Sequence, residues 1–368
     1  MTEQELEKAL RTAAEADVAV IFAGLPEIFE SEGYDRTSMK LPQCQDRLIK
    51  EVLKVQPNVV VVLHNGSPVE LPWADKVSAI LEMYLGGQGV GEACDRLLYG
   101  EANPSGRLAE TFPYRLEDNP SFLHFPGNGK RVLYGEDIFV GYRYYDTKKV
   151  PVRYAFGHGL SYTEFTYGDL TLSSAQMTDE DILTVSFKVK NTGKTEGKEV
   201  VQLYVADLCG TPERPVKELK GFAKVHLLPG EEKTVSMEIS ARDLSYYEER
   251  LGDWYAPSGT YRILIGHASD DIRLHADIVF ETKKKLPLRV DFTTTFGELL
   301  DHTKTAPVIT ELLAPLAAAA ASAEGMSDEY KKLGEQVIRE MPLKSLLGQM
   351  PGEQVEQLIG QLNCLLAQ

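Results

Sequence analysis

At 368 residues the chain exceeds the ~100 to 200 residues of a typical domain, so two or three domains are expected. The formal net charge of -16, with no stripe of Lys and Arg between aromatic residues, excludes nucleic acid as a partner. The longest apolar runs, such as 59–63 and 317–321, are far shorter than the ~20 residues of a membrane-spanning helix, so no membrane partner is expected.

The cysteines and the N-terminal residues indicate the compartment. Cys44, Cys94, Cys209 and Cys364 are scattered and lack the spacing of a zinc site, so we expect no metal and no cofactor. Free, mostly buried thiols in a reducing compartment are predicted. Residues 1–5 are acidic and lack the basic, apolar start of a secretory signal, which predicts a cytoplasmic protein.

The first part of the chain alternates amphipathic helices with strands that are apolar on both faces. Helices are expected at 2–16, 42–54 and 90–98, and strands at 18–22, 59–63 and 79–85. In the second helix Leu48, Val52 and Val55 are expected to face inward. This alternation predicts an α/β domain with a parallel sheet covered on both sides.

From about residue 168 the apolar pattern changes to a period of two. Strands are expected at 183–189, 200–205, 234–239 and 261–265, separated by turns rich in Gly, Pro and Asn. They predict an antiparallel sandwich similar to immunoglobulin domains. After a basic linker at 283–285, helices are expected at 309–323, 327–340 and 352–366. The fold class is therefore α/β plus all-β with a helical C-terminal tail, and the predicted domains are 1–165, 166–282 and 283–368.

A short acidic segment, 30–36, follows the first strand with the sequence Glu-Ser-Glu-Gly-Tyr-Asp-Arg. Loops that follow parallel strands meet at the carboxyl edge of the sheet, where ligands usually bind. Glu32 is the candidate general acid, because a partly buried carboxyl group can protonate a leaving group near neutral pH. Tyr34 and Arg36 are candidates for orienting a polar substrate. The alternative is a solvated loop in which Arg36 pairs with one of the carboxylates.

Two other motifs have structural explanations that we favour. The turn Gly-Gly-Gln-Gly at 86–89 precedes a helix but lacks the G-x-G-x-x-G spacing of a dinucleotide site, so close packing of strand and helix explains it better. This makes a flavodoxin-like nucleotide binder a weak third hypothesis. His64, at the end of a strand, is better explained as a hydrogen-bonded structural histidine than as a site residue.

The order of several motifs resembles the C-terminal half of family 3 glycoside hydrolases, the β-glucosidase family. The motifs are EGYDR at 32–36, NGSPVE at 65–70, NPSGRL at 103–108, TFP at 111–113, VGYRYY at 140–145 and FGHGLSYT at 156–163. The sandwich is similar to the fibronectin type III-like domain of that family, with NTG at 191–193, VVQLY at 200–204 and KELKGF at 217–222. The resemblance runs from about residue 10 to 280, and MPLKSL at 341–346 resembles a tail of some bacterial members.

The resemblance implies a retaining glycosidase mechanism, in which one carboxylate attacks the sugar and a second protonates the departing oxygen. It places the acid/base on Glu32 and the nucleophile on an aspartate of a preceding (β/α)8 barrel, which residues 1–368 do not include. We therefore expect little hydrolysis of β-glucosides or oligosaccharides by this chain alone, and a barrel-bearing half or a second copy as partner. The alternative is a non-catalytic association or scaffolding protein derived from the same family.

Overall fold

The computed structural model describes residues 1–210, 213–321 and 327–367. The chain divides into two compact units. Unit 1 comprises Met1–Tyr246 and Ala256–Lys283, and unit 2 comprises Tyr247–Tyr255 and Lys284–Gln368. Among the described residues, no helix is both long and apolar enough to cross a bilayer.

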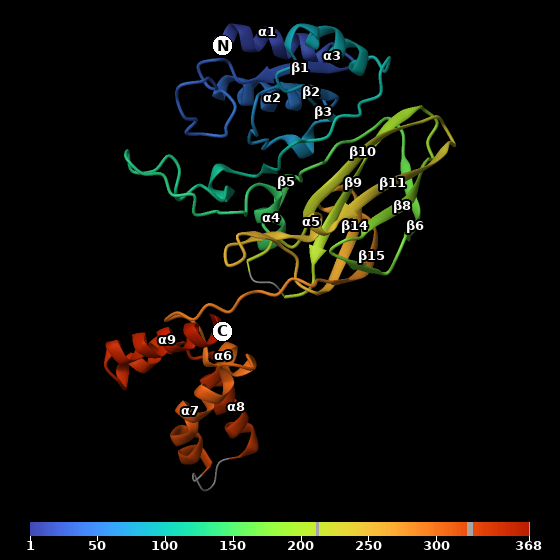
Figure 1. Cartoon of the computed structure of the whole chain (residues 1–368). Helices are drawn as coiled ribbons and strands as arrows, with labels where there is room; N and C mark the ends of the chain where they lie inside the picture. The colour runs from blue at the N-terminus through green and yellow to red at the C-terminus, as the bar shows by residue number, and fades with distance from the viewer. Residues whose placement is uncertain (211–212, 322–326, 368) are drawn as a thin grey trace. The chain divides into compact units, whose positions relative to one another are not determined.

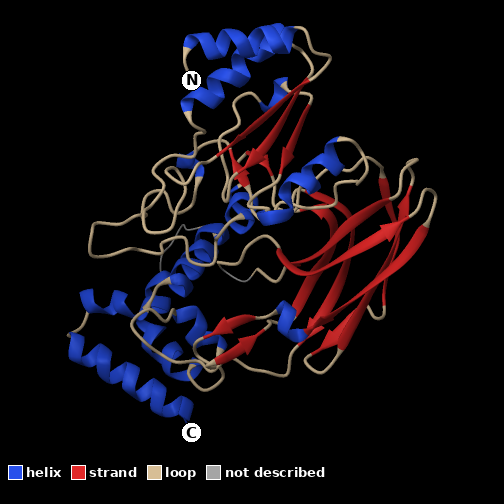
Figure 2. Cartoon of the chain, turned by 90° about the horizontal axis from the view of Figure 1, so that it is seen from above, coloured by secondary structure: helices blue, strands red, loops and turns tan. Residues whose placement is uncertain are grey.

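Unit 1 begins with a three-stranded parallel sheet flanked by helices (Figure 1, Figure 2). The elements are α1 (Glu3–Ala14), β1 (Ala19–Gly24), α2 (Gln43–Val55), β2 (Val59–His64), β3 (Ala79–Glu82) and α3 (Val90–Leu98). The strand order is β1-β2-β3, and the register aligns Ala19 with Val59 and Val60 with Ala79. Thr2 starts α1 as the sequence predicts, because its hydroxyl accepts from the Glu5 amide at 3.2 Å.

The helices cover one face of β1 and leave the other face open. Ile21 and Ala23 are buried in the same apolar cluster as Ile49 of α2. On the opposite face, Val20 is 42% exposed and Phe22 60%. The expectation of a sheet covered on both sides is therefore wrong at β1, because no described element packs over this face of the strand.

The inward face of α2 also differs from the prediction at one position. Ile49 and Val52 are buried, whereas Val55 is 42% exposed. The next residue, Gln56, takes the buried position instead, and its side-chain amide donates to the carbonyl oxygens of Ala13, at 3.1 Å, and of Ala16. A polar side chain thus joins the ends of α1 and α2 and turns Val55 outward.

A connecting segment leads from the parallel sheet to the sandwich. It contains β4 (Phe112–Pro113) paired with β5 (Val152–Tyr154), and α4 (Tyr142–Lys148). The Tyr142 hydroxyl accepts from the Leu219 amide at 2.7 Å, and Lys217 pairs with Asp146 at 2.7 Å. These contacts fix α4 against the sandwich.

The sandwich packs a five-stranded sheet on a three-stranded sheet (Figure 1). Its elements are β6 (Phe165–Leu172), β7 (Gln176–Thr178), β8 (Ile182–Asn191), β9 (Gly197–Asp207), β10 (Glu218–Leu227), β11 (Glu232–Ser240), α5 (Ala241–Leu244), β14 (Gly259–Ala268) and β15 (Asp271–Glu281). The strand orders are β10-β9-β14-β15-β7 and β11-β8-β6. Phe187, Leu203, Ile263 and Phe280 lie in the core with at most 1% exposure. The predicted boundaries near 165 and 282 stay predictions.

Unit 2 is a small helical body with its own core. It contains most of a hairpin, β12 (Tyr246–Glu248) with β13 (Asp253–Tyr255), and the helices α6 (Phe296–Asp301), α7 (Ala306–Ala321), α8 (Asp328–Glu340) and α9 (Gly352–Ala367). Phe296, Leu299, Ile309, Leu343 and Val355 are buried together. Residues 322 and 323 of the predicted helix at 309–323 lie outside the described residues.

All four cysteines are free. Cys94 is buried and Cys209 half-buried, but Cys44 and Cys364 are exposed, so the expectation of mostly buried thiols is wrong for two of the four. Cys44 is exposed because it lies in the first turn of α2, away from the face that carries Ile49 and Val52.

Candidate functional site

The loops after β1 and β2 meet at the carboxyl edge of the parallel sheet, and Glu30 joins them. Its Oε2 accepts from the backbone N–H of Gly66 at 2.6 Å, and its Oε1 accepts from the Ser67 hydroxyl. Arg36 reaches the same carboxylate at 3.4 Å and also donates to the Ser67 hydroxyl and to the Pro68 carbonyl oxygen. The Glu30 and Arg36 side chains are 20% and 18% exposed. Glu30 is therefore held in one position and remains accessible.

Gly66 makes the approach of Glu30 possible. A Cβ atom at this position would lie 3.1 Å from Glu30 Oε2 and 3.1 Å from a methyl carbon of Leu85. A side chain here would meet both groups more closely than ordinary packing allows. The Asn-Gly-Ser motif at 65–67 thus supplies a backbone donor, and glycine lets Glu30 approach it without displacing either side chain.

The predicted acid, Glu32, lies in the same loop in a different environment. Its side chain is exposed, and among the described contacts only its backbone oxygen is engaged, by the Ser31 hydroxyl at 3.3 Å. Tyr34 is 49% exposed and donates to the Glu27 carbonyl oxygen at 2.6 Å. Of the three residues named from the sequence, Arg36 contacts Glu30 at the sheet edge, Tyr34 lines a cavity together with Arg36, and Glu32 is exposed.

Two further carboxyl groups lie near Glu30 and were not identified from the sequence. Burial raises the pKa of Glu82, the last residue of β3, to about 7, although hydrogen bonds from the Tyr84 amide at 2.9 Å and the Asn65 side chain at 3.2 Å oppose the rise. Burial, together with the charge of Glu30, also raises the pKa of Glu110. Three carboxyl groups therefore share this edge, and one of them exchanges a proton near neutral pH.

A cavity of about 410 Å³ opens beside this cluster. Its lining includes Asp35, Arg36 and Ser67 on one side and Phe122 and Phe125 on the other. Polar groups next to aromatic rings are typical of a surface that binds a sugar or another protein. Within the described residues, no group of three or more His, Cys, Asp or Glu side chains is arranged to hold a metal ion.

The other two motifs occupy structural positions. His64 stacks on Phe22 with ring centroids 6.3 Å apart, and the hydrogen bond expected for its ring is not found among the described contacts. At the glycine turn, a Cβ atom on Gly86 would lie 2.6 Å from the Val90 side chain, which begins α3. Close packing between strand and helix therefore accounts for a glycine at 86.

Unit 1 thus combines an α/β part that carries an acidic loop with a two-sheet sandwich. Residues 2–162 match the glycosyl hydrolase family 3 C-terminal domain, and residues 199–269 match the fibronectin type III-like domain. The chain belongs to glycosyl hydrolase family 3.

Similar proteins of this family are named β-glucosidases. The thermostable β-glucosidase B of Acetivibrio thermocellus is 47% identical over 365 residues, which cover 98% of this chain and 48% of that protein. The crystal structure of a Bifidobacterium adolescentis family 3 β-glucosidase matches with a TM-score of 0.77 and 39% identity, covering 84% of this chain and 45% of that one. A Kluyveromyces marxianus β-glucosidase in complex with glucose matches with a TM-score of 0.72 and 43% identity, over 76% and 33% of the two chains. The chain thus spans less than half the length of these relatives.

Proposed function

We propose that this chain supplies the proton-donating part of a retaining β-glucosidase that removes terminal β-D-glucosyl residues from glucosides or oligosaccharides. The observation that supports it is the carboxylate-bearing loop at 30–36. Its Glu30 pairs with Arg36 and accepts from the Gly66 amide, and these contacts hold the loop at the carboxyl edge of the sheet. Relatives named β-glucosidases, one of them in complex with glucose, support the substrate class.

The reaction needs two carboxyl groups ~5 to 5.5 Å apart on either side of the glycosidic bond. One attacks the anomeric carbon while the other protonates the leaving oxygen, and the second then takes a proton from water as the glycosyl-enzyme intermediate is hydrolysed. We propose that this loop contributes the proton donor and that the nucleophile belongs to a (β/α)8 barrel outside residues 1–368.

Two residues of the loop compete for the role of proton donor. The sequence resemblance names Glu32, whose exposed side chain is able to reach a partner's substrate. The contacts favour Glu30, because a catalytic group must be held in a fixed position and only Glu30 is anchored, by Gly66, Ser67 and Arg36.

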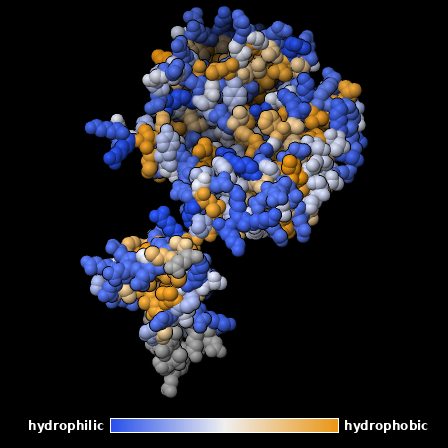
Figure 3. Space-filling view, in the orientation of Figure 1, coloured by the Kyte–Doolittle hydropathy of each residue, from blue (hydrophilic) through white to orange (hydrophobic). Residues whose placement is uncertain are grey.

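The partner is proposed to cover apolar surface around this loop. Ile28 is 79% exposed, Leu85 76% and Leu123 86%, and Figure 3 shows apolar side chains among polar ones on the upper part of unit 1. The uncovered face of β1 with Phe22 adds to this surface. A barrel-bearing half is the proposed occupant, and a second copy of the chain is the alternative. Cytoplasmic location stays a prediction.

The test combines the chain with the barrel-bearing remainder of the Acetivibrio thermocellus relative and follows cleavage of aryl β-glucosides. We expect no turnover by the chain alone and turnover by the mixture. Turnover by the chain alone would contradict the division of the two carboxyl groups, and stable complex formation without turnover would favour the scaffolding alternative.

A matched pair of variants in the same mixture then identifies the acid. Glu30→Ala and Glu32→Ala differ by two positions in one loop. Loss of the acid/base should slow substrates with poor leaving groups about 10²- to 10⁴-fold and should be rescued by azide, which attacks the glycosyl-enzyme without a general base. We expect this pattern for Glu30→Ala. The same pattern in Glu32→Ala would assign the role to Glu32 instead.

A further inference from the structure

The cavity of about 410 Å³ borders the residues that hold Glu30. Arg36 and the Ser67 hydroxyl both contact the Glu30 carboxylate, and both residues line the cavity. The segment 116–126 contributes Phe122 and Phe125 to the lining, and these two residues are 40% and 50% exposed. Sites for small molecules have volumes of about 300 to 1,000 Å³, so this cavity is large enough for part of a substrate.

The chemistry of the proposed reaction decides which part of the substrate lies here. The acid protonates the oxygen of the departing group, while the nucleophile attacks the sugar from the side opposite to that group. The departing group, or aglycone, therefore lies beside the proton donor. Because the loop at 30–36 is proposed to carry the donor, the aglycone must lie against this chain, whether Glu30 or Glu32 is the acid. The inference thus rests on the proposed function.

The polar groups of the lining are largely engaged within the protein. Ser67 and Arg36 both contact Glu30. The side-chain nitrogen of Asn119 donates within its own segment, and its oxygen accepts from the Tyr145 hydroxyl at 3.3 Å. A second sugar ring would bring several hydroxyl groups that need hydrogen-bond partners, whereas an aryl group needs none. The engaged polar groups and the two phenylalanine rings therefore favour an aryl group over a sugar in this cavity.

We propose that this cavity receives the aglycone and selects aryl β-glucosides over disaccharides. Phe122 and Phe125 contact the aryl ring and are the residues that determine this specificity. Asp35 also lines the cavity, and its side chain is exposed. Its negative charge disfavours an aglycone that carries a carboxylate, because like charges repel. The preferred aglycone is therefore an uncharged aryl group.

The first test measures binding to the chain alone, with phenyl β-D-glucoside as the probe. In saturation-transfer NMR, the aryl protons should receive more saturation from the protein than the sugar protons. Phe122→Ala removes one ring contact and should weaken binding about 3- to 10-fold. Phe122→Tyr keeps the ring and should bind as the wild type does.

Phe29→Ala is the matched control for this test. Phe29 is 45% exposed and lines the separate cavity of about 330 Å³, so its removal should leave binding unchanged. No binding, equal saturation of the aryl and sugar protons, or a loss in Phe29→Ala that Phe122→Ala does not show would overturn the proposal.

The second test measures specificity in the mixture with the barrel-bearing remainder of the Acetivibrio thermocellus relative. The ratio of kcat/KM for 4-methylphenyl β-glucoside to that for cellobiose should fall about 3- to 10-fold in Phe122→Ala. Asp35→Asn should raise turnover of 4-carboxyphenyl β-glucoside about 2- to 5-fold relative to the 4-methylphenyl substrate. Unchanged ratios would contradict the assignment of the aglycone site. A mixture without turnover would contradict the proposed function, and the binding spectra of the first test would still decide whether the cavity takes an aryl group.

Discussion

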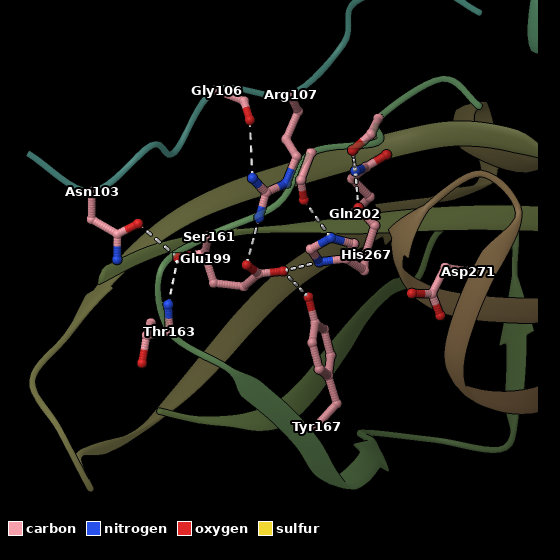
Figure 4. Close-up of polar contacts among 12 residues, drawn as sticks. Asn103, Gly106, Arg107, Ser161, Thr163, Tyr167, Glu199, Gln202, His267 and Asp271 are labelled. Atoms are coloured by element: carbon pink, nitrogen blue, oxygen red, sulfur yellow. Dashed lines mark hydrogen bonds and ion pairs between the residues drawn. The ribbon is translucent and has the colours of Figure 1, made fainter. Parts of the chain in front are cut away.

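Unit 1 contains two clusters of charged and polar side chains. One, at the edge of the parallel sheet, has more carboxyl groups than donors, and the other, around Glu199, has more donors than carboxyl groups. At the sheet edge, Glu30, Glu82 and Glu110 lie near one another, and Arg36 pairs with Glu30. Where the α/β part meets the sandwich, the Glu199 carboxylate receives donors from an arginine, a histidine and a tyrosine (Figure 4). The first arrangement raises the pKa of Glu82 to about 7, and the second lowers that of Glu199. Burial is the main cause of the raised pKa of Glu82, whereas at Glu199 the hydrogen bond from His267 and the charge of Arg107 outweigh burial.

The largest effect is expected when the donor-rich cluster loses its carboxylate. Glu199→Ala leaves Arg107, His267 and Tyr167 without their common acceptor, a side chain that is fully buried. Breaking a buried pair in this way should lower the free energy of unfolding by about 3 to 5 kcal/mol. Urea denaturation measures the change. Glu238→Ala, at an exposed position of β11, is the control and should stay within about 0.5 kcal/mol of the wild type.

The acceptor-rich cluster should lose stability as the pH rises. Glu82 has a pKa of about 7 in the folded chain against 4.5 for an ordinary glutamate, so the folded state holds the proton more tightly. Stability therefore falls as the pH rises from about 4.5 to 7, by an amount on the order of 3 kcal/mol. Glu82→Gln should remove this fall in urea titrations at pH 4.5 and 8. Glu92→Gln, at an exposed position of α3, should retain it.

A smaller loss of stability is expected when a methyl group is added at Gly66, whose amide donates to Glu30. Gly66→Ala places a methyl group 3.1 Å from the Glu30 carboxylate and should cost about 1 to 3 kcal/mol in thermal or urea unfolding. Gly91→Ala is the matched substitution, because nothing lies within 4 Å of its added Cβ atom, and it should be neutral or slightly stabilising. Equal effects of the two variants would show that the contact with Glu30 is not tight.

The smallest effect on stability should come from breaking a carboxylate–arginine pair that lies at the surface. Arg262 and Asp277 form a two-pronged pair at 2.6 and 2.9 Å, with side chains 39% and 43% exposed. Water and salt screen this pair, so Asp277→Ala should leave the unfolding midpoint unchanged within error. A loss as large as that of Glu199→Ala would mean that burial is not what distinguishes the two clusters.

Much of the fold could be predicted from the sequence, and bulges account for part of what was missed. The unbroken apolar run at 59–63 and the alternation in β8, β9, β11 and β14 indicated their strands correctly. In β6 the pairing slips between Gly168 and Thr171, and in β10 between Leu219 and Gly221, so neither keeps a strict period of two. β15 was missed although it alternates; charged or polar residues occupy most of its outward positions.

The sites were harder to predict because their members are distant in sequence. The segment 30–36 was recognisable as an acidic loop, but which carboxylate Arg36 would meet depends on how the loop folds over Gly66 and Ser67. Glu82 reaches this edge because parallel strands end together, whereas Glu110 comes from the segment just before β4, far along the chain. The Glu199 cluster draws on residues from 107 to 267, and no local pattern connects them.

The two exposed thiols give each unit a natural attachment point for a dye. Cys44 lies at the start of α2 in unit 1, and Cys364 lies on α9 in unit 2. Cys94 and Cys209 are shielded, and burial raises the pKa of both thiols, so maleimide reagents should react with the exposed pair first. Energy transfer between donor and acceptor dyes on these two residues would therefore report the separation of the units without any introduced cysteine.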